Sequence, residues 1–398
     1  MENVSQRVSS LAISQTLEMS QKSRDLQAQG IDIINLSVGE PDFNTPQHIK
    51  EAAIKAIHDN YSHYSPVPGY PELLKAISGK LKRENNLEYA TDQIIVSNGA
   101  KHSLANVILS LINKGDEVIV PAPYWVSYVE LVKLAEGTNV IIDTDIDSDF
   151  KITPEQLKKA ITPKTKAMFL CSPSNPSGSL YSKNELEAIA KVVAESGVDM
   201  HILSDEIYEH INFVGKHESI AQFDFIRDKV IIINGVSKGY AMTGWRIGYI
   251  AAPKWIAKAC NKIQGQLTSG ASSVSQMASV AALNIETDNI KEMVVAFKRR
   301  RDLVVKLTKE IKDFRVNVPE GAFYLFPEVK SLFGKSYNGK TIKDASDLAL
   351  YILEEAHVAT VTGDAFGSPD YLRFSYATSD EKLEEAIKRM KNAIEKLK

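Results

Sequence analysis

The chain of 398 residues has little cysteine and no long apolar run. Its two cysteines, Cys171 and Cys260, belong to no C-x-x-C pair, which excludes a disulfide framework and a zinc ribbon and favours reduced thiols. No apolar run approaches the roughly 18 residues that a membrane span needs. Residues 1–30 carry several charges and no apolar stretch of the kind found in signal peptides. We therefore expect a cytoplasmic protein with no membrane partner.

An excess of charge of one sign is also missing. The 47 basic and 50 acidic side chains leave a net charge of −3, so a basic surface for nucleic acid is not expected. The eight histidines form no H-E-x-x-H motif and no clustered pair, so no metal site is expected. A hydrophobic fraction of 44% and a charged fraction of 24% are those of an ordinary globular protein, and the length favours two domains.

Strand and helix signals alternate through the first two thirds of the chain, which predicts a mostly parallel sheet covered by helices. Short apolar runs bounded by turn residues predict the strands, and longer stretches between them predict the helices. The expected strands are 31–36, 93–96, 117–120, 140–143, 167–171, 201–204, 230–234 and 246–251. The expected helices are 14–29, 46–60, 71–85, 100–111, 125–135, 154–160 and 183–196.

The C-terminal part has a different pattern, which predicts a smaller α+β domain. Its expected elements are strands at 322–326, 358–361 and 372–376 and helices at 344–356 and 380–397. A long helix expected around 284–307 is able to bridge the two parts. We therefore place a large domain at 46–284 and a small domain formed by 1–45 together with 285–398.

The segment 235–248, GVSKGYAMTGWRIG, carries the clearest chemical signal. Lys238 lies among small residues just after the apolar run 230–233, where a rigidly held amine can form a Schiff base. Arg246 follows eight residues later and can bind a phosphate group. Together they suggest a phosphate-bearing aldehyde cofactor, pyridoxal 5'-phosphate.

This segment resembles the lysine-attachment signature of the class I/II pyridoxal-phosphate aminotransferases, and the chain is similar to their bacterial aspartate aminotransferase branch. Further motifs of that branch follow in order from SVGEPDF at 37–43 to RFSYATS at 373–379, so the resemblance covers nearly the whole chain. It implies an α/β structure of fold type I, with a mostly parallel central sheet and a smaller α+β domain. It also implies a homodimer whose two active sites share residues.

The resemblance assigns the cofactor ring to residues of three motifs. In SDEIYEH, Asp205 is expected to pair with the pyridine nitrogen and Tyr208 to hydrogen-bond the ring oxygen. In SPSNPSG, Asn175 is expected to donate to the same oxygen, and the Asn175–Pro176 bond is expected to be cis. Trp125, in PAPYWVSY, is expected to stack on the ring.

The phosphate is assigned to the turn SNGAKHSL and to the lysine segment. The backbone N–H groups of Ala100 and Lys101, at a helix start, would receive it. Ser237 and Arg246 would add a hydroxyl and a charge-assisted pair. Tyr64 matches a family tyrosine that reaches the phosphate from the neighbouring subunit, although a packed loop aromatic is its plainer interpretation.

On the substrate side, the resemblance assigns the α-carboxylate to Arg373, whose planar fork suits a carboxylate. The backbone of Gly39 is expected to help from the opposite wall, with Trp125 and Asn175 also touching the substrate. Lys238 would then carry the proton between the substrate Cα and the cofactor.

The distal group of the substrate decides specificity. The side chain of Lys101 and a hydroxyl near Ser14 or Thr16 are expected to meet an acidic group there, which favours dicarboxylic amino acids. Ala12 stands where some relatives carry a lysine linked to prephenate, which weighs against prephenate without excluding it.

The expected function is ping-pong transfer of the amino group of an L-amino acid to a 2-oxo acid. L-Aspartate and 2-oxoglutarate are the favoured pair. Broader aromatic, neutral or prephenate specificity and a carbon–sulfur lyase on the same fold stay open as alternatives.

The segment GKSYNGKT (334–341) fits the P-loop pattern G-x-x-x-x-G-K-[ST]. A true P-loop follows a buried strand directly and opens a helix, whereas this segment lies in a polar stretch well before the next expected helix. We interpret it as a surface loop that binds no nucleotide.

Overall fold

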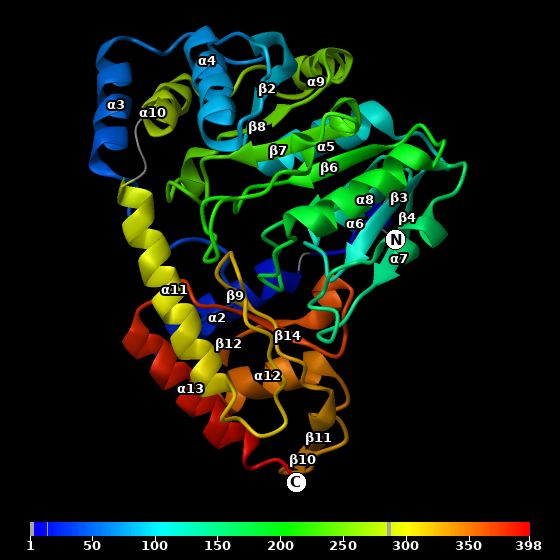
Figure 1. The fold of residues 1–398 in the computed structure, drawn as a ribbon. Helices are drawn as coiled ribbons and strands as arrows, with labels where there is room; N and C mark the ends of the chain where they lie inside the picture. Colours follow the sequence, from blue (N-terminus) through cyan, green and yellow to red (C-terminus); the bar gives the residue numbers. More distant parts are fainter. Residues whose placement is uncertain (1–3, 14, 285–287) are drawn as a thin grey trace.

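The computed structural model describes residues 4–13, 15–284 and 288–398. Its centre is a seven-stranded sheet in the order β2-β8-β7-β6-β5-β3-β4, in which β8 runs antiparallel to both of its neighbours. The strands are β2 (Ile94–Ser97), β3 (Glu117–Ala122), β4 (Thr138–Asp143), β5 (Thr165–Cys171), β6 (His201–Asp205), β7 (Val230–Gly235) and β8 (Gly248–Ala251). Helices cover this sheet (Figure 1), as the alternating pattern predicted.

Both faces of the central sheet are apolar. In β7, Val230 and Ile232 pack into the core on one face, and Ile231 and Ile233 pack into the core on the other. All four side chains are fully buried. This two-sided burial explains why the strand is a continuous apolar run in the sequence and shows no alternation.

The helices around the sheet lie close to their predicted positions. They are α3 (Gln47–His58), α4 (Pro71–Lys80), α5 (Ala100–Leu111), α6 (Ser127–Leu134), α7 (Pro154–Ala160) and α8 (Lys183–Glu195), with a π-helical turn at Leu81–Asn85 after α4. Two further helices, α9 (Lys254–Leu267) and α10 (Ser273–Asn284), lie outside the sequence prediction. The buried positions of α10 include several serines and alanines, so its apolar pattern is weak.

A second unit lies below the sheet in Figure 1 and joins the N-terminal segment to the C-terminal part. Its helices are α2 (Gln15–Ala28), α12 (Ala345–Ala356) and α13 (Asp380–Ile394), and its strands are β1 (Ile34–Asn35), β9 (Tyr324–Leu325), β12 (Val358–Ala359), β13 (Val361–Thr362) and β14 (Leu372–Ser375). β1 pairs with β12, which places the N-terminal segment in this unit. α11 (Asp288–Thr308) runs between the two units, as expected of the bridging helix.

We propose the division into a large domain, 46–284, and a small domain, 1–45 with 285–398. Most of one apolar cluster belongs to the small domain, with Phe297, Leu372 and Phe374 fully buried in it, and residues 207–213 of the large domain pack against the same cluster. A core that differs from the two on the faces of the sheet supports the division.

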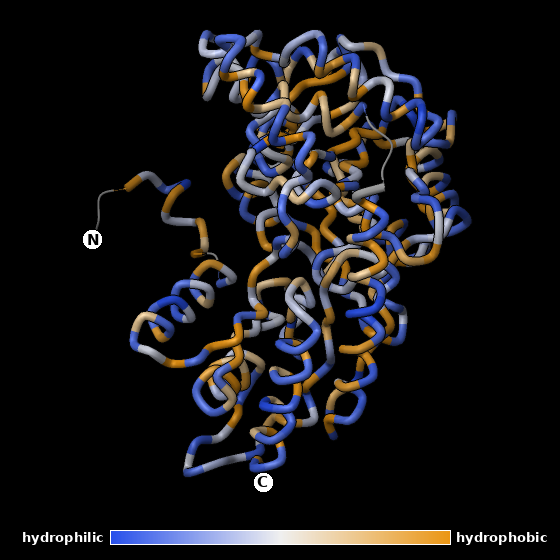
Figure 2. The backbone as a smooth tube through the Cα atoms, turned by 90° about the vertical axis from the view of Figure 1, so that its left-hand side faces the viewer, coloured by the Kyte–Doolittle hydropathy of each residue, from blue (hydrophilic) through white to orange (hydrophobic). Residues whose placement is uncertain are grey.

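The segment before α2 lies on the outside of the molecule (Figure 2). Its short helix α1 (Gln6–Ser9) contacts α6, and the Ala12 N–H donates to Glu130 Oε2 at 2.9 Å. Among the helices in the described ranges, none is both long and apolar enough to cross a membrane.

The segment that fits the P-loop pattern is a β-hairpin. β10 (Ser336–Tyr337) pairs antiparallel with β11 (Lys340–Thr341) around Asn338 and Gly339, which have φ values of 48° and 77°. Two positive φ values in a two-residue turn are typical of a tight hairpin. The next α-helix, α12, begins four residues after this hairpin and has Asp344 as its N-cap, so no helix opens at Lys340.

Candidate active site

One pocket lies beside the carboxyl ends of the parallel strands, where ligands bind in open α/β sheets. The predicted site residues that line it are Gly39, Ala100, Lys101, Trp125, Asn175, Asp205, Tyr208, Ser237, Lys238, Arg246 and Arg373. Tyr64 is the exception, because it lies outside this pocket and is 98% exposed in the single chain. Thr16 also lines the pocket, whereas Ser14 lies outside the described residues.

Lys238 enters the pocket from the segment after β7. Its Nζ donates to the Gly39 carbonyl at 2.6 Å, which brings two distant motifs together. Burial, assisted by the positive charges of Arg246 and Arg373, lowers the pKa of Lys238 to about 8. An amine with a pKa this close to neutrality is partly unprotonated, which makes it a nucleophile and a base.

Asp205 is the last residue of β6 and is 4% exposed. Its Oδ2 accepts from the Tyr128 hydroxyl at 2.6 Å, and its Oδ1 accepts from the Ile207 N–H at 3.3 Å. Burial raises the pKa of Asp205 to about 6, although both hydrogen bonds favour the charged form. The two hydrogen bonds therefore do not fully offset the desolvation of the charged carboxylate, and a cation beside it would stabilise its charged form.

Glycines allow the phosphate-binding elements to approach one another closely. A Cβ at Gly99, the N-cap of α5 with a φ of 84°, would collide with the Arg246 guanidinium, and a Cβ at Gly248 would collide with the Ala100 backbone. The first N–H groups of α5 have no intrahelical partner and are available to an anion. Arg246 was expected within a strand, but β8 begins at Gly248 and Arg246 has a left-handed φ of 58°.

Arg373 is buried and has no carboxylate partner among the described residues. Its Nη1 donates to Asn175 Oδ1 at 3.1 Å and its Nη2 to the Ser37 carbonyl at 2.7 Å, while its Nε has no hydrogen-bond partner within the described chain. The guanidinium lies 4.7 Å from the ring of Tyr324 and 4.8 Å from that of Phe366. Burial lowers the pKa of Arg373. A buried cation with unused donors is complementary to a carboxylate ligand.

The Asn175–Pro176 bond is cis, as the resemblance implied. Asn175 is buried at 6% exposure and lines the same pocket as Lys238.

Two tyrosines of the pocket were missed by the sequence prediction. Tyr128 belongs to the same motif as Trp125, three residues further along, so helical spacing was the available signal for it. Tyr324 comes from β9 of the small domain, and its hydroxyl lies 2.8 Å from the hydroxyl of Tyr208. No motif marks Tyr324 in the sequence.

The outer part of the pocket is more open. The Lys101 side chain is exposed, and its Nζ lies 4.9 Å from the ring of Trp125. Partial burial and the charge of Arg246 lower the pKa of Lys101. Thr16, at the start of α2, lines the pocket together with Lys101 and so supplies the expected hydroxyl.

The family model described as aminotransferase class I and II matches residues 31–390. The chain is 48% identical over 393 residues to a probable aspartate/prephenate aminotransferase of Rickettsia bellii, with 98% of each chain covered. It is 46% identical over 401 residues to a bifunctional aspartate aminotransferase and glutamate/aspartate-prephenate aminotransferase of Petunia hybrida, covering 100% of this chain and 84% of that protein.

Solved structures agree in fold. The aspartate aminotransferase of Rhizobium meliloti superimposes with a TM-score of 0.96 at 43% identity and covers 100% of both chains. The aspartate aminotransferase of Thermus thermophilus with maleate gives a TM-score of 0.93 at 37% identity, covering 99% of this chain and 100% of that one.

Proposed function

The chain belongs to the class I and II aminotransferases, as its motifs predicted, and on that premise we propose that it uses pyridoxal 5'-phosphate to move the amino group of L-aspartate to 2-oxoglutarate. One observation carries the proposal. Lys238, Asp205 and Arg373 face a single pocket, and each is a charged group whose burial is only partly compensated. An amine, an acid and a carboxylate-binding cation are the groups that transamination requires.

The residues of the pocket fit the cofactor. The incompletely compensated carboxylate of Asp205 suits a protonated ring nitrogen, and the Lys238 amine suits the aldehyde. Tyr208 and Asn175 would hold the ring oxygen, and Trp125 would cover the ring. Gly99 and Gly248 let the start of α5 approach the segment that carries Arg246, and the phosphate would lie there. Its ligands would be the backbone N–H groups of Ala100 and Lys101 and the side chains of Ser237 and Arg246. When bound, the protonated cofactor ring withdraws electrons from the substrate carbon that loses its proton.

The protein residues supply binding and proton transfer. Arg373 holds the α-carboxylate of the substrate, and the aromatic rings against it keep its guanidinium in one orientation. Lys238 Nζ would carry the proton between the substrate Cα and the aldehyde carbon of the cofactor. Because its pKa is lowered to about 8, the amine gives up and regains a proton readily near neutral pH.

Specificity for a dicarboxylic substrate is proposed from the open end of the pocket. Lys101 supplies a cation and Thr16 a hydroxyl there, which suits a second carboxylate. The Thermus relative was solved with maleate, which is itself a dicarboxylate.

Prephenate is a second candidate acceptor, because the Rickettsia and Petunia relatives carry it in their names. Ala12 weighs against it, since its side chain offers no charge to a prephenate carboxylate.

We also propose a cytoplasmic homodimer in which Tyr64 reaches the phosphate of the neighbouring subunit. Tyr64 is 98% exposed, and the nearby helix α3 exposes Ile54 and Ile57, so a second copy of the chain would cover apolar surface. Sedimentation analysis of the protein tests the dimer. A monomer at micromolar concentration would reject both the shared site and the role of Tyr64.

The experiment for the reaction uses the cofactor-loaded protein without any 2-oxo acid. Single amino acids are added, and the loss of its visible absorbance is followed in time. L-Aspartate is expected to react fastest, and a faster aromatic or neutral amino acid would overturn the assigned donor. Release of pyruvate from a sulfur amino acid under these conditions would indicate the lyase alternative. The acceptors 2-oxoglutarate and prephenate are then compared by the rate at which each restores the absorbance.

A further inference from the structure

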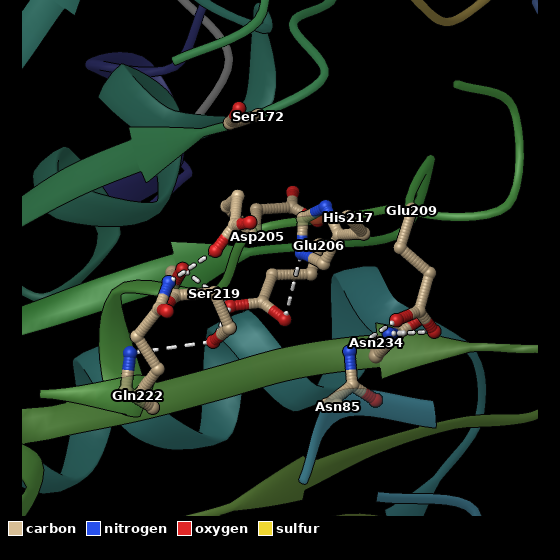
Figure 3. Close-up of polar contacts among 12 residues, drawn as sticks. Asn85, Ser172, Asp205, Glu206, Glu209, His217, Ser219, Gln222 and Asn234 are labelled. Carbon is tan, nitrogen blue, oxygen red and sulfur yellow. Dashed lines mark hydrogen bonds and ion pairs between the residues drawn. The ribbon is translucent and has the colours of Figure 1, made fainter. Parts of the chain in front are cut away.

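A buried polar layer lies behind the pocket, on the segment that follows β6 (Figure 3). Asp205 and Tyr208 line the pocket, whereas Glu206 and Glu209 turn to the buried layer behind it. Both glutamates are at most 5% exposed. The turn that carries two proposed cofactor ligands is therefore held from behind by two carboxylates.

Glu209 has the larger set of partners. Its Oε1 accepts from Asn234 Nδ2 at 2.7 Å and its Oε2 from Asn85 Nδ2 at 3.0 Å, and Lys80 forms an ion pair with it. Lys80 is fully buried. Burial by itself would raise the pKa of Glu209, but Lys80 and two histidines hold it well below its ordinary range. The carboxylate therefore stays ionised, and both of its oxygens accept hydrogen bonds.

These contacts join the two segments that carry the proposed cofactor ligands. Asn234 lies in β7, four residues before Lys238, and its Oδ1 accepts from the Gly235 N–H at 2.7 Å. A second contact also joins these two segments. The His210 ring packs so closely on Gly239 that a Cβ there would lie 2.5 Å from its Nδ1. The ring of the residue after Glu209 thus lies against the backbone next to Lys238.

A purely stabilising role explains this arrangement poorly. A buried ion pair is often no more stabilising than a well-packed apolar pair, because both charges lose their water. A metal site is also a poor explanation. Glu206, Glu209 and His217 have potential ligand atoms within 4.8 Å of one another, but Lys80 already supplies the positive charge at Glu209. His217 likewise faces Glu206, with Nε2 and Oε2 3.2 Å apart.

We propose that Glu209 is a positioning residue for the aminotransferase reaction, which acts through its hydrogen bond to Asn234 to fix Asp205 and Tyr208 relative to Lys238. The inference rests on the proposed cofactor. Because the α-carboxylate site at Arg373 is separate, loss of this tie should reduce kcat and leave KM for the amino acid little changed.

The test compares two double variants of equal charge. Lys80→Met/Glu209→Gln keeps an acceptor for Asn234, whereas Lys80→Met/Glu209→Met removes it, and neither leaves a buried charge unpaired. The readouts are the pH midpoint of the visible absorbance of the cofactor-loaded protein, the affinity for pyridoxal 5'-phosphate measured by quenching of tryptophan fluorescence, and kcat with KM. Asn234→Leu, which keeps the Lys80–Glu209 pair, serves if the methionine double variant does not fold.

The glutamine double variant should keep the midpoint of the parental protein. The methionine double variant, or Asn234→Leu, should shift it by about one pH unit and lower kcat by about tenfold with KM unchanged. Coincident midpoints and kcat values in all variants would overturn the positioning role. If the parental protein itself develops no visible band with pyridoxal 5'-phosphate, the proposed function fails first, and this inference fails with it.

Discussion

The pocket has two regions that differ in their exposure to water. Its floor is formed by Asp205, Lys238 and Arg373, and its rim by Thr16, Lys101 and Arg246. Asp205 and Arg373 are at most 4% exposed, whereas Lys101 and Arg246 are exposed. The floor residues form hydrogen bonds with residues 37–39, Tyr128 and Asn175, whereas the exposed rim residues keep much of their hydration.

The difference separates the proposed ligands of the cofactor ring and the α-carboxylate, which are buried, from the proposed ligands of the phosphate and of the distal substrate group, which lie near solvent. Burial displaces the pKa of each ionisable floor residue in the direction that favours its neutral form. That displacement lowers stability, so these residues are retained in spite of their effect on folding. Lys101 and Arg246 remain exposed, although partial burial lowers the pKa of Lys101 too, so the rim charges lose less hydration than the floor charges.

Lys238→Ala should produce the largest loss. Without the amine, no covalent bond to the cofactor forms and no group carries the proton, so turnover should fall by about 10⁴-fold or more. Borohydride reduction followed by mass spectrometry measures covalent attachment directly. The rim variant Lys101→Ala is the control and should still gain the mass of the cofactor. Labelling of the Lys238→Ala protein at the parental level would contradict the assignment.

Asp205→Asn should separate stability from activity on the floor. The folded-state pKa of Asp205 is raised to about 6 from its ordinary value of 3.8, so the folded protein binds this proton more tightly than the unfolded chain. The carboxylate therefore costs no stability at pH values below 3.8, and its cost grows until the pH exceeds 6. Near neutral pH the cofactor-free variant should be more stable by at most about 3 kcal/mol.

Turnover by Asp205→Asn should nevertheless fall by about a hundredfold or more, because a neutral amide cannot keep the ring nitrogen protonated. Urea unfolding at pH values from 4 to 8 measures the stability difference. A variant that is less stable than the parent across this range would mean that the carboxylate is compensated in the folded protein. Tyr128→Phe provides the control, since it removes the 2.6 Å hydrogen bond and keeps the charge.

Two floor residues, Asp205 and Lys238, could be predicted from motifs that end or follow strands, whereas Arg373 lies within β14 and was predicted from the resemblance alone. Asn175 and Asp205 follow or end buried parallel strands, so their meeting at one edge of the sheet follows from the strand pattern. Tyr324 could not be predicted, since the small domain brings it to the pocket and no local pattern marks it. The pairing of Lys80 with Glu209, 129 residues away, could not be predicted either, because no local pattern marks it.

Local backbone details also escaped the sequence pattern. The left-handed φ of Arg246 shortens the strand that was expected to contain it, and the contact of its guanidinium with Gly99 joins segments far apart in the sequence. α10 escaped because serines and alanines fill its buried face, where size matters more than hydrophobicity. Motifs thus identified the chemistry, whereas contacts between distant segments required the structure.

Lys101→Ala should give the smallest effect and test the rim most sharply. Removal of the ammonium should raise KM for L-aspartate by about tenfold, because the distal carboxylate loses one charge-assisted hydrogen bond. An aromatic amino acid has no such group, so its KM should stay within about twofold. Lys191→Ala, an exposed lysine on α8 that pairs with Glu187, is the matched control and should change neither value. An equal loss with both substrates would mean that the Lys101 side chain serves the cofactor and not the distal group of the substrate. Lys101 would then have to be grouped with the cofactor ligands.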